Sequence, residues 1–271
     1  MQSSLIATDC SELTIEIGGL PIRLRVDDPD FVRLLESRYA NYVTSSREAR
    51  FEFEIDVCSA GSSFGDEDAS VRWDSGRWYL DRGDFRAEWN PSSGKGRVQQ
   101  TANPYSIDSV LRIVHTLLLA RDGGFLMHAS SAVRNGRAFL FAGVSGAGKT
   151  TMARLAPPDV AVLTDEISYV TRKKGDYFAF GTPFAGELGR PGLNMRAPLA
   201  GVYLLAKGTE NKIEEVNTEE AIRAVLRNIL FFAKDPEIVK PVFQSACEFA
   251  ETVPIRSLTF VPDSRVWELI V

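Results

Sequence analysis

Gly143-Val-Ser-Gly-Ala-Gly-Lys-Thr-Thr151 is the stretch that decides how the rest of this sequence is interpreted. It fits the pattern G-x-x-x-x-G-K-[ST], in which the backbone N–H groups of a glycine-rich loop surround phosphate groups. The glycines at 143, 146 and 148 let the backbone approach phosphate oxygens closely, because they carry no Cβ atom. The stretch therefore predicts a loop that binds a nucleoside triphosphate.

The segments on either side of the loop have the composition that the motif requires. Residues 138–142 are a short apolar run typical of a buried strand, and residues 151–155 are expected to form a short helix that stops before Pro157. A strand, a glycine loop and a helix in this order bring the positive end of the helix dipole to the phosphates. A glycine-rich turn that only happens to contain a lysine is the alternative.

Individual residues of the loop can be given roles. Lys149 would reach the β- and γ-phosphates, and the hydroxyl of Thr150 would ligate Mg²⁺. The residues expected to contact the nucleotide are Gly143, Ser145, Gly146, Ala147, Gly148, Lys149, Thr150 and Thr151.

A second acidic motif follows closely. Asp165 ends an apolar segment sixteen residues after Lys149. A carboxylate at this place can hold Mg²⁺ directly or through water, or it can take the proton of an acceptor hydroxyl. A solvated aspartate at the end of a strand is the alternative. The Glu166 side chain could equally well contact the residues that ligate magnesium or lie on the surface.

The short interval between the two motifs leaves room for only one short helix. In this spacing, in the loop sequence, and in a histidine on the preceding strand, the chain resembles HPr kinase/phosphorylase. The loop also resembles that of ATP-dependent phosphoenolpyruvate carboxykinase. The resemblance covers about residues 123–271, with specific motifs at 143–151 and 163–166.

The resemblance implies a catalytic set of three residues and a metal set that overlaps it. Lys149 would bind the phosphates, Asp165 would be the base that activates an acceptor serine, and His128 would assist near the transferred phosphoryl group. Mg²⁺ would be held by Thr150, Asp165 and Glu187. From the residues alone, His128 can equally be a packed core histidine, and Glu187 a surface residue of a glycine-containing loop.

Two departures separate the chain from HPr kinase/phosphorylase. The family's glutamate-arginine-glycine-x-glycine signature after the second motif is not present in that form, and residues 1–90 show no likeness. The layout is more similar to HPr-kinase-related stand-alone proteins, some of which phosphorylate serine on modified-peptide precursors.

The chain as a whole is expected to combine α+β and α/β folds in two domains. Residues 1–103 predict a mainly antiparallel β domain with a helix. A long amphipathic helix at 104–122, capped by Ser106 and carrying a partly buried His115, would connect it to the second domain. The resemblance implies that this second domain, 123–271, is a P-loop kinase domain like those of HPr kinase and phosphoenolpyruvate carboxykinase.

Three tryptophans of the first domain, Trp73, Trp78 and Trp89, lie on short predicted strands. Aromatic side chains at alternate positions are typical of one buried face of an antiparallel sheet. We expect that buried face, and a platform that stacks on a ligand is the alternative.

Composition argues against several classes of function. The chain has 271 residues, 44% of them hydrophobic and 25% charged, with a net charge of −5. A mildly acidic protein is a poor match for nucleic acid, which attracts basic surfaces. The three cysteines lie far apart and form no C-x-x-C pair, so neither a zinc site nor a disulfide framework is predicted.

Neither export nor a membrane partner is predicted. The first residues lack the basic and apolar regions of a signal peptide, and charged residues interrupt the apolar helix at 104–122. Separated thiols suit a reducing compartment, so we expect a cytoplasmic protein. The hexamers of the resembled family make a homo-oligomer an expectation.

These features favour phosphoryl transfer. The primary hypothesis is an ATP- and Mg²⁺-dependent kinase that transfers the γ-phosphoryl group to a hydroxyl, with a serine of a peptide or small protein as acceptor. A small-molecule kinase stays open, as does a nucleotide-binding regulatory module with little turnover.

Overall fold

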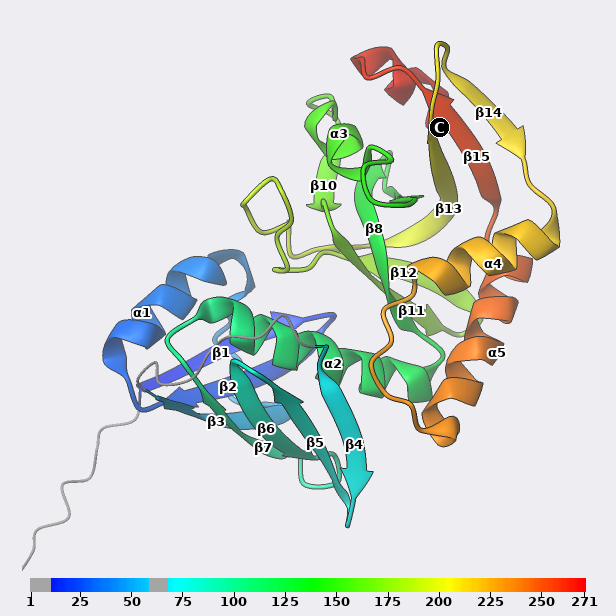
Figure 1. The fold of residues 1–271 in the computed structure, drawn as a ribbon. Coiled ribbons are helices and arrows are strands. Elements are labelled where there is room, and N and C mark those ends of the chain that lie inside the picture. The colour runs from blue at the N-terminus through cyan, green and yellow to red at the C-terminus, as the bar shows by residue number, and fades with distance from the viewer. Residues whose placement is uncertain (1–10, 59–67) are drawn as a thin grey trace, which may run out of the picture. The chain divides into compact units, whose positions relative to one another are not determined.

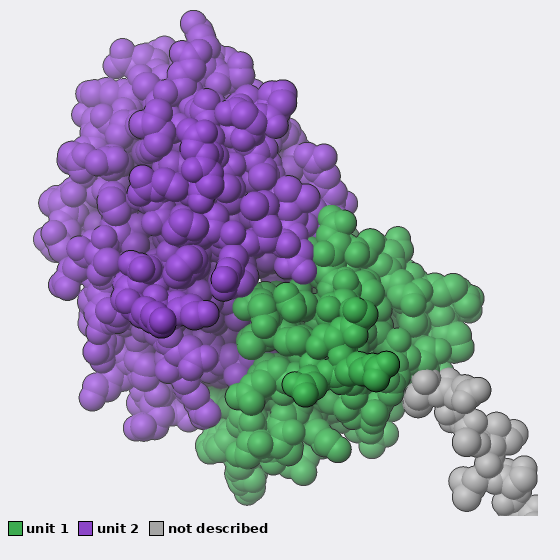
Figure 2. All heavy atoms as spheres, turned by 180° about the vertical axis from the view of Figure 1, so that it is seen from behind, with its two compact units in different colours: residues 1–111 green, residues 112–271 purple. Residues whose placement is uncertain are grey.

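The computed structural model describes residues 11–58 and 68–271. The chain divides into two compact units, Met1–Leu111 and Arg112–Val271 (Figures 1 and 2). The division falls inside helix α2 (Pro104–Asp122), the helix expected between the domains. The expectations about the N-terminal leader and Cys10 lie outside the described residues.

Unit 1 is built on one seven-stranded sheet of order β1-β2-β3-β7-β6-β5-β4. The pairs β2–β3 and β3–β7 are parallel, and the other four pairs are antiparallel. The strands are β1 (Ser11–Ile17), β2 (Leu20–Val26), β3 (Phe51–Val57), β4 (Ser70–Asp74), β5 (Arg77–Arg82), β6 (Phe85–Asn90) and β7 (Lys95–Gln100).

Local sequence explains the start of unit 1. Apolar and polar residues alternate along β1 and β2, and the apolar set is buried. Gly18 and Gly19 have φ angles of 63° and 78°, as the tight hairpin between these strands requires. Asp28 then caps α1 (Pro29–Arg38), because its carboxylate accepts the N–H groups of Asp30 and Phe31. A short 3₁₀ helix, η1 (Ala40–Tyr42), follows.

The tryptophans only partly follow the expectation of one buried face. Trp78 and Trp89 are 2% and 1% exposed and belong to the core of unit 1. Trp73 is 42% exposed, because β4 is the edge strand of the sheet and its side chains lie largely in solvent. Its ring packs on Trp78 with centroids 5.1 Å apart.

The predicted cap of α2 is wrong by three residues. The helix begins at Pro104, where the Asn103 side chain accepts the N–H of Tyr105 at 3.0 Å. The hydroxyl of Ser106 instead donates to Asp84 at 2.7 Å, so Ser106 lies inside the first turn. His115 is completely rather than partly buried, and this burial lowers its pKa to about 3.

Unit 2 contains an eight-stranded sheet. Its main path is β10-β8-β11-β12-β13-β15-β14, and β9 pairs with both β8 and β13. The pairs β9–β13 and β13–β15 are parallel, and the others are antiparallel. The strands are β8 (Phe125–Arg134), β9 (Arg137–Ala142), β10 (Ala161–Thr164), β11 (Ile167–Lys173), β12 (Asp176–Phe180), β13 (Arg196–Lys207), β14 (Lys212–Glu215) and β15 (Ile255–Phe260).

The helices of unit 2 are few and lie against this sheet. The short α3 (Lys149–Arg154) packs on β8 and β9, while α4 (Thr218–Asn228) and α5 (Pro236–Thr252) pack on each other (Figure 1). The chain ends with a 3₁₀ helix, η2 (Ser264–Leu269), whose Trp267 is buried. Among the described residues, no helix combines the length and apolar character needed to span a bilayer.

The two sheets and their helices form a mixed α/β architecture, as the sequence predicts.

Candidate functional site

Strand register brings three separate segments together at one edge of unit 2. On one side of β8, Ala129 pairs with Ala142, the residue before the glycine loop. On the other side, His128 pairs with Ile167, the first residue of β11. Asp165 and Glu166 occupy the interval between β10 and β11. The pairing of β8 with its neighbours thus places the histidine, the loop and the acidic pair around one point.

The glycine loop has a backbone that other residues would not adopt. Gly146 and Gly148 have φ angles of 76° and 113°, in the region that favours glycine. A Cβ atom on Gly148 would lie 2.5 Å from the ring of Phe260 on β15. A Cβ atom on Gly143 would lie 2.8 Å from that of Ala147. A side chain at position 143 or 148 would therefore clash with a neighbouring residue, and position 146 favours glycine because its φ angle is positive.

Lys149 begins α3, but its side chain turns back into the loop. The ammonium nitrogen Nζ donates to the carbonyl oxygen of Gly143 at 3.0 Å and to that of Val144 at 3.4 Å. Only 8% of the residue is exposed. Burial lowers the pKa of Lys149, and the negative charges of Glu166 and Glu187 act in the opposite direction. The cation is thus enclosed by the loop and faced by two carboxylates.

Asp165 holds a second loop in place. Its Oδ1 accepts the N–H of Gly186 and its Oδ2 accepts the N–H of Leu188, both at 2.9 Å. The residue is 4% exposed. A Cβ atom on Gly186 would lie 2.9 Å from Asp165 Oδ2 and 2.9 Å from Glu166 Cβ, so the glycine permits this close contact. The prediction of Asp165 as a site residue did not include this anchoring role, since its partners lie 21 and 23 residues away.

Glu187 lies between the two anchored amides. Its side chain is 76% exposed and lies 3.9 Å from Arg154 Nη2 on α3. Arg154 follows Thr150 by one helical turn, which puts both residues on the same face of α3. The 181–189 loop therefore contacts the helix that begins at the phosphate motif, and Glu187 is one of the charges that act on Lys149.

His128 is half-buried at the same edge. Burial lowers the pKa of His128, and the positive charges of Lys149 and Arg112 lower it further. The imidazole is consequently neutral at neutral pH and offers one donor and one acceptor nitrogen. A neutral ring next to a lysine suits a polar contact with a substrate group better than it suits an ion pair.

Arg112 is a site neighbour that the sequence interpretation missed. Its guanidinium carbon lies 5.0 Å from the ring centroid of Phe184, a fully buried residue of the 181–189 loop. Its Nε is buried and finds no hydrogen-bond partner among the described residues. The sequence offers one signal for Arg112, since this arginine interrupts the apolar stripe of the helix. On its own, that interruption argues only against a membrane span.

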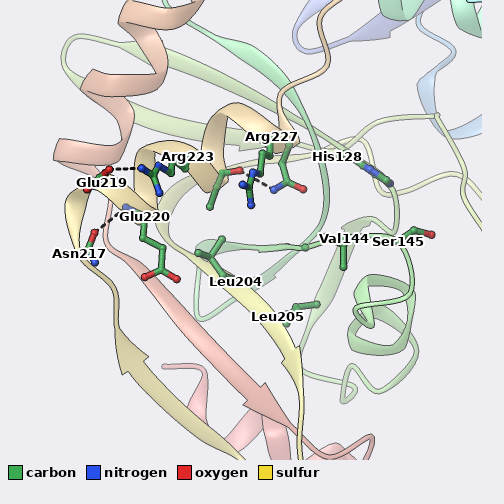
Figure 3. Close-up of a pocket in the computed structure, with 13 residues that line it drawn as sticks. His128, Val144, Ser145, Leu204, Leu205, Asn217, Glu219, Glu220, Arg223 and Arg227 are labelled. Atoms are coloured by element: carbon green, nitrogen blue, oxygen red, sulfur yellow. Dashed lines mark hydrogen bonds and ion pairs between the residues drawn. The ribbon is translucent and has the colours of Figure 1, made fainter.

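A pocket of about 600 Å³ opens beside the loop (Figure 3). His128 and the loop residues Gly143, Val144 and Ser145 form part of its lining. Leu204 and Leu205 of β13 also line it, together with polar residues of α4. Pockets of 300–1,000 Å³ are typical of small-ligand sites, so the volume beside the loop is of functional size.

The model of one protein family, described as "SynChlorMet cassette protein ScmC", matches residues 96–271, almost two thirds of the chain. The chain belongs to the ScmC family. The ScmC match includes α2, the glycine loop, Asp165, the 181–189 loop and α4. No curated protein matches the chain.

A solved structure, the HPr(Ser) kinase/phosphatase from Coxiella burnetii, is similar to part of the ScmC-family chain. It is 11% identical, with a TM-score of 0.26, and the match covers 45% of this chain and 87% of that chain. A similarity at this level carries no argument about the site, which therefore rests on its own geometry.

No cluster of three or more His, Cys, Asp or Glu side chains is placed to hold a metal ion within residues 11–58 and 68–271. This does not conflict with the expected Mg²⁺ set of Thr150, Asp165 and Glu187, because Mg²⁺ at phosphate sites is bound by only one or two carboxylates together with substrate phosphates and water. In this ScmC-family chain, Thr150 is the second residue of α3, directly after Lys149, and Asp165 keeps lone pairs beyond the two that accept N–H groups.

Proposed function

We propose that this ScmC-family chain is an ATP- and Mg²⁺-dependent phosphotransferase that moves the γ-phosphoryl group to a hydroxyl. The observation that carries the proposal is the enclosure of the Lys149 ammonium by the glycine loop, at the edge where His128 pairs with Ile167, two residues after Asp165. Phosphoryl transfer needs positioning and charge neutralisation more than covalent chemistry. The site supplies fixed N–H groups, a buried cation and a carboxylate.

The loop is suited to bind the nucleotide in a defined direction. Lys149 in this motif contacts the β- and γ-phosphates, while the backbone N–H groups of the glycine-rich loop surround the α- and β-phosphates. Phosphate oxygens would replace the carbonyl oxygens of Gly143 and Val144 as acceptors for the Lys149 ammonium. The exchange favours binding because a hydrogen bond to a charged acceptor is stronger than one to a neutral carbonyl.

Thr150, Asp165 and Glu187 are the residues that would hold Mg²⁺, and the negative charge of Glu187 also opposes the effect of burial, which lowers the pKa of Lys149. A bound Mg²⁺ neutralises the charge that develops on the phosphates. The lone pairs that Asp165 does not use for Gly186 and Leu188 leave it room for this contact, or for the proton of the acceptor.

In the proposed reaction the acceptor oxygen forms a bond to the γ-phosphorus, and the bond from that phosphorus to the bridging oxygen breaks. Asp165 accepts the proton of the hydroxyl. Lys149 stabilises charge on the phosphates, and neutral His128 offers a hydrogen bond next to the transferred group. A serine of a peptide or small protein is the proposed acceptor.

The direct experiment is incubation of the purified protein with [γ-³²P]ATP, Mg²⁺ and host extract, followed by mass spectrometry of labelled products. The proposal predicts a phosphoserine in a peptide or small protein. Label found only in a metabolite would favour a small-molecule kinase on the same site. ATP binding without any labelled product would instead indicate a regulatory module.

A further inference from the structure

The helix α4 is far from the glycine loop in sequence but is tied to the strand that carries His128. Ile229, directly after α4, forms an antiparallel bridge with Met127. The N–H of Leu230 donates to the carbonyl oxygen of Leu126 at 2.9 Å. Since Met127 precedes His128, these bonds hold the C-terminal end of α4, with Arg227, beside the histidine.

The pocket between α4 and the loop adjoins the γ-phosphate end of the site. The Lys149 ammonium contacts the carbonyls of Gly143 and Val144, and both residues line the pocket. The lysine of this motif marks the β- and γ-phosphates. The pocket therefore lies where an acceptor must approach, and not where the nucleoside extends.

The lining of the pocket combines an apolar surface with charged residues of α4, of which Arg227 and Glu220 form no ion pair with another described residue. Leu204 lies next to Ala142 in the sheet and, with Leu205, forms the apolar part. Arg223 forms an ion pair with Glu219 on its own helix. Arg227 is exposed, lines the pocket (Figure 3) and makes no ion pair with another described residue.

We propose that the acceptor carries a carboxylate close to its reactive hydroxyl, and that Arg227 binds this carboxylate and thereby selects the acceptor. Arginine presents parallel N–H donors that match the two oxygens of a carboxylate. The inference rests on the proposed function, since it concerns the acceptor of that reaction. Arg227 takes no part in the bond changes, and the electron pair of the broken bond leaves with ADP.

The same chemistry occurs in two kinds of acceptor: a serine beside an acidic residue of a peptide, and a free hydroxy acid. The experiment therefore has two arms. One uses a positional library of serine peptides with a single fixed flanking residue, and the other uses L-serine and small hydroxy acids beside their amides. Each arm is run with [γ-³²P]ATP on wild type, Arg227→Gln, Arg227→Glu and the control Lys240→Gln, which changes an exposed cation on α5 outside the pocket.

Wild type and Lys240→Gln are expected to prefer carboxylate-bearing acceptors by about tenfold or more over the matched amides, which corresponds to one charge-assisted hydrogen bond. Arg227→Gln should reduce the preference to near unity, and Arg227→Glu should reverse it toward Lys or Arg. The KM for ATP should change less than about twofold, because Arg227 adjoins the acceptor and not the nucleoside.

Three results would overturn the inference. The first is a carboxylate preference that persists in Arg227→Glu. The second is a raised KM for ATP with unchanged acceptor selection, which would assign the pocket to the nucleotide. The third is transfer of label by wild type with no preference for carboxylate-bearing acceptors. A wild type that does not bind ATP, or that binds ATP but labels no acceptor in either arm, contradicts the proposed function itself, and the inference with it.

Discussion

The ammonium group of Lys149 is a tightly held charge of the candidate site. It is almost fully buried, donates to two carbonyls of its own loop and is faced by Glu166 and Glu187. The carbonyls keep the side chain in the loop, so its orientation is set before a nucleotide arrives. Preorganised charge of this kind contributes more to binding than a flexible surface lysine would.

Lys149→Met is expected to weaken binding of a non-hydrolysable ATP analogue by about 10- to 150-fold. A hydrogen bond to a charged group contributes about 1.5–3 kcal/mol, and methionine keeps the length of the side chain without its charge. Isothermal titration calorimetry with Mg²⁺ measures the change. Lys240→Met should bind as wild type, and equal affinity of both variants would contradict the phosphate-loop assignment.

The buried His115 predicts a pH dependence of stability. Burial lowers its pKa to about 3, whereas an unfolded histidine has a pKa of about 6.5. Between these values only the unfolded chain binds the proton, so stability falls as the pH falls from about 6.5 toward 3, by up to about 1.4 kcal/mol per pH unit.

Thermal unfolding of wild type and His115→Phe between pH 7 and pH 4.5 tests this dependence. Phenylalanine keeps a ring next to Tyr169, whose centroid lies 5.3 Å from that of His115, but it cannot titrate. The difference in melting temperature between the two proteins should shift in favour of the variant as the pH falls. A difference that does not change with pH would show that His115 does not contribute.

Among the elements, the 181–189 loop is the one that the site depends on without a motif to reveal it. Asp165 fastens its backbone at Gly186 and Leu188, Thr182 donates to Ile167 at 2.7 Å, and Phe184 is fully buried against Arg112. These contacts fix Glu187 over α3. An aspartate that both anchors a loop and contacts substrate would couple the order of the loop to the chemistry.

Asp165→Asn is expected to raise the hydrogen-exchange rates of the Gly186 and Leu188 amides by about tenfold or more. An asparagine side chain has one acceptor oxygen in place of two, so one of these N–H groups loses its partner. Exchange mass spectrometry measures the loop peptide. Asp159→Asn, which alters the ion pair with Arg134 at 3.1 Å, should leave the loop protected. Unchanged exchange in Asp165→Asn would contradict the anchoring role.

At the scale of the whole molecule, the residues of the proposed nucleotide site all lie in unit 2. Binding to a folded state stabilises it by about 2.7 kcal/mol at a ligand concentration of one hundred times Kd. An ATP analogue with Mg²⁺ should therefore protect amides of residues 112–271 from exchange, with the loop and α3 protected most. Protection confined to peptides from residues 11–58 and 68–111 would place the nucleotide in unit 1 and contradict the proposed site.

The part of the molecule that sequence could predict is the part encoded locally. The glycine loop, the strand before it and the helix after it are contiguous, and the caps Asp28, Asn217 and Asp235 accept backbone N–H groups as their residue types favour. Asp165 could be found because it directly follows an apolar strand and lies only sixteen residues after Lys149.

The remainder depends on contacts between distant segments. The bonds from Gly186 and Leu188 to Asp165, the bridge between Ile229 and Met127, and the cation–π contact of Arg112 with Phe184 follow from strand register and helix packing. Local composition carries no signal for them. For this reason α4 enters the site only once the fold is known, and so does the anchoring of the 181–189 loop, from which the family resemblance supplied Glu187 alone.

The measurement that tests the central claim most directly is a single-turnover assay with [γ-³²P]ATP, Mg²⁺ and the serine-peptide library, comparing wild type with Lys149→Met and Asp165→Asn. The account predicts ³²P in peptide serine with wild type, and a loss of transfer of about 100-fold or more in each variant. Lys149→Met should fail through binding, whereas Asp165→Asn should still bind the ATP analogue. Equal transfer by Asp165→Asn and wild type, or release of label only as inorganic phosphate, would contradict the account.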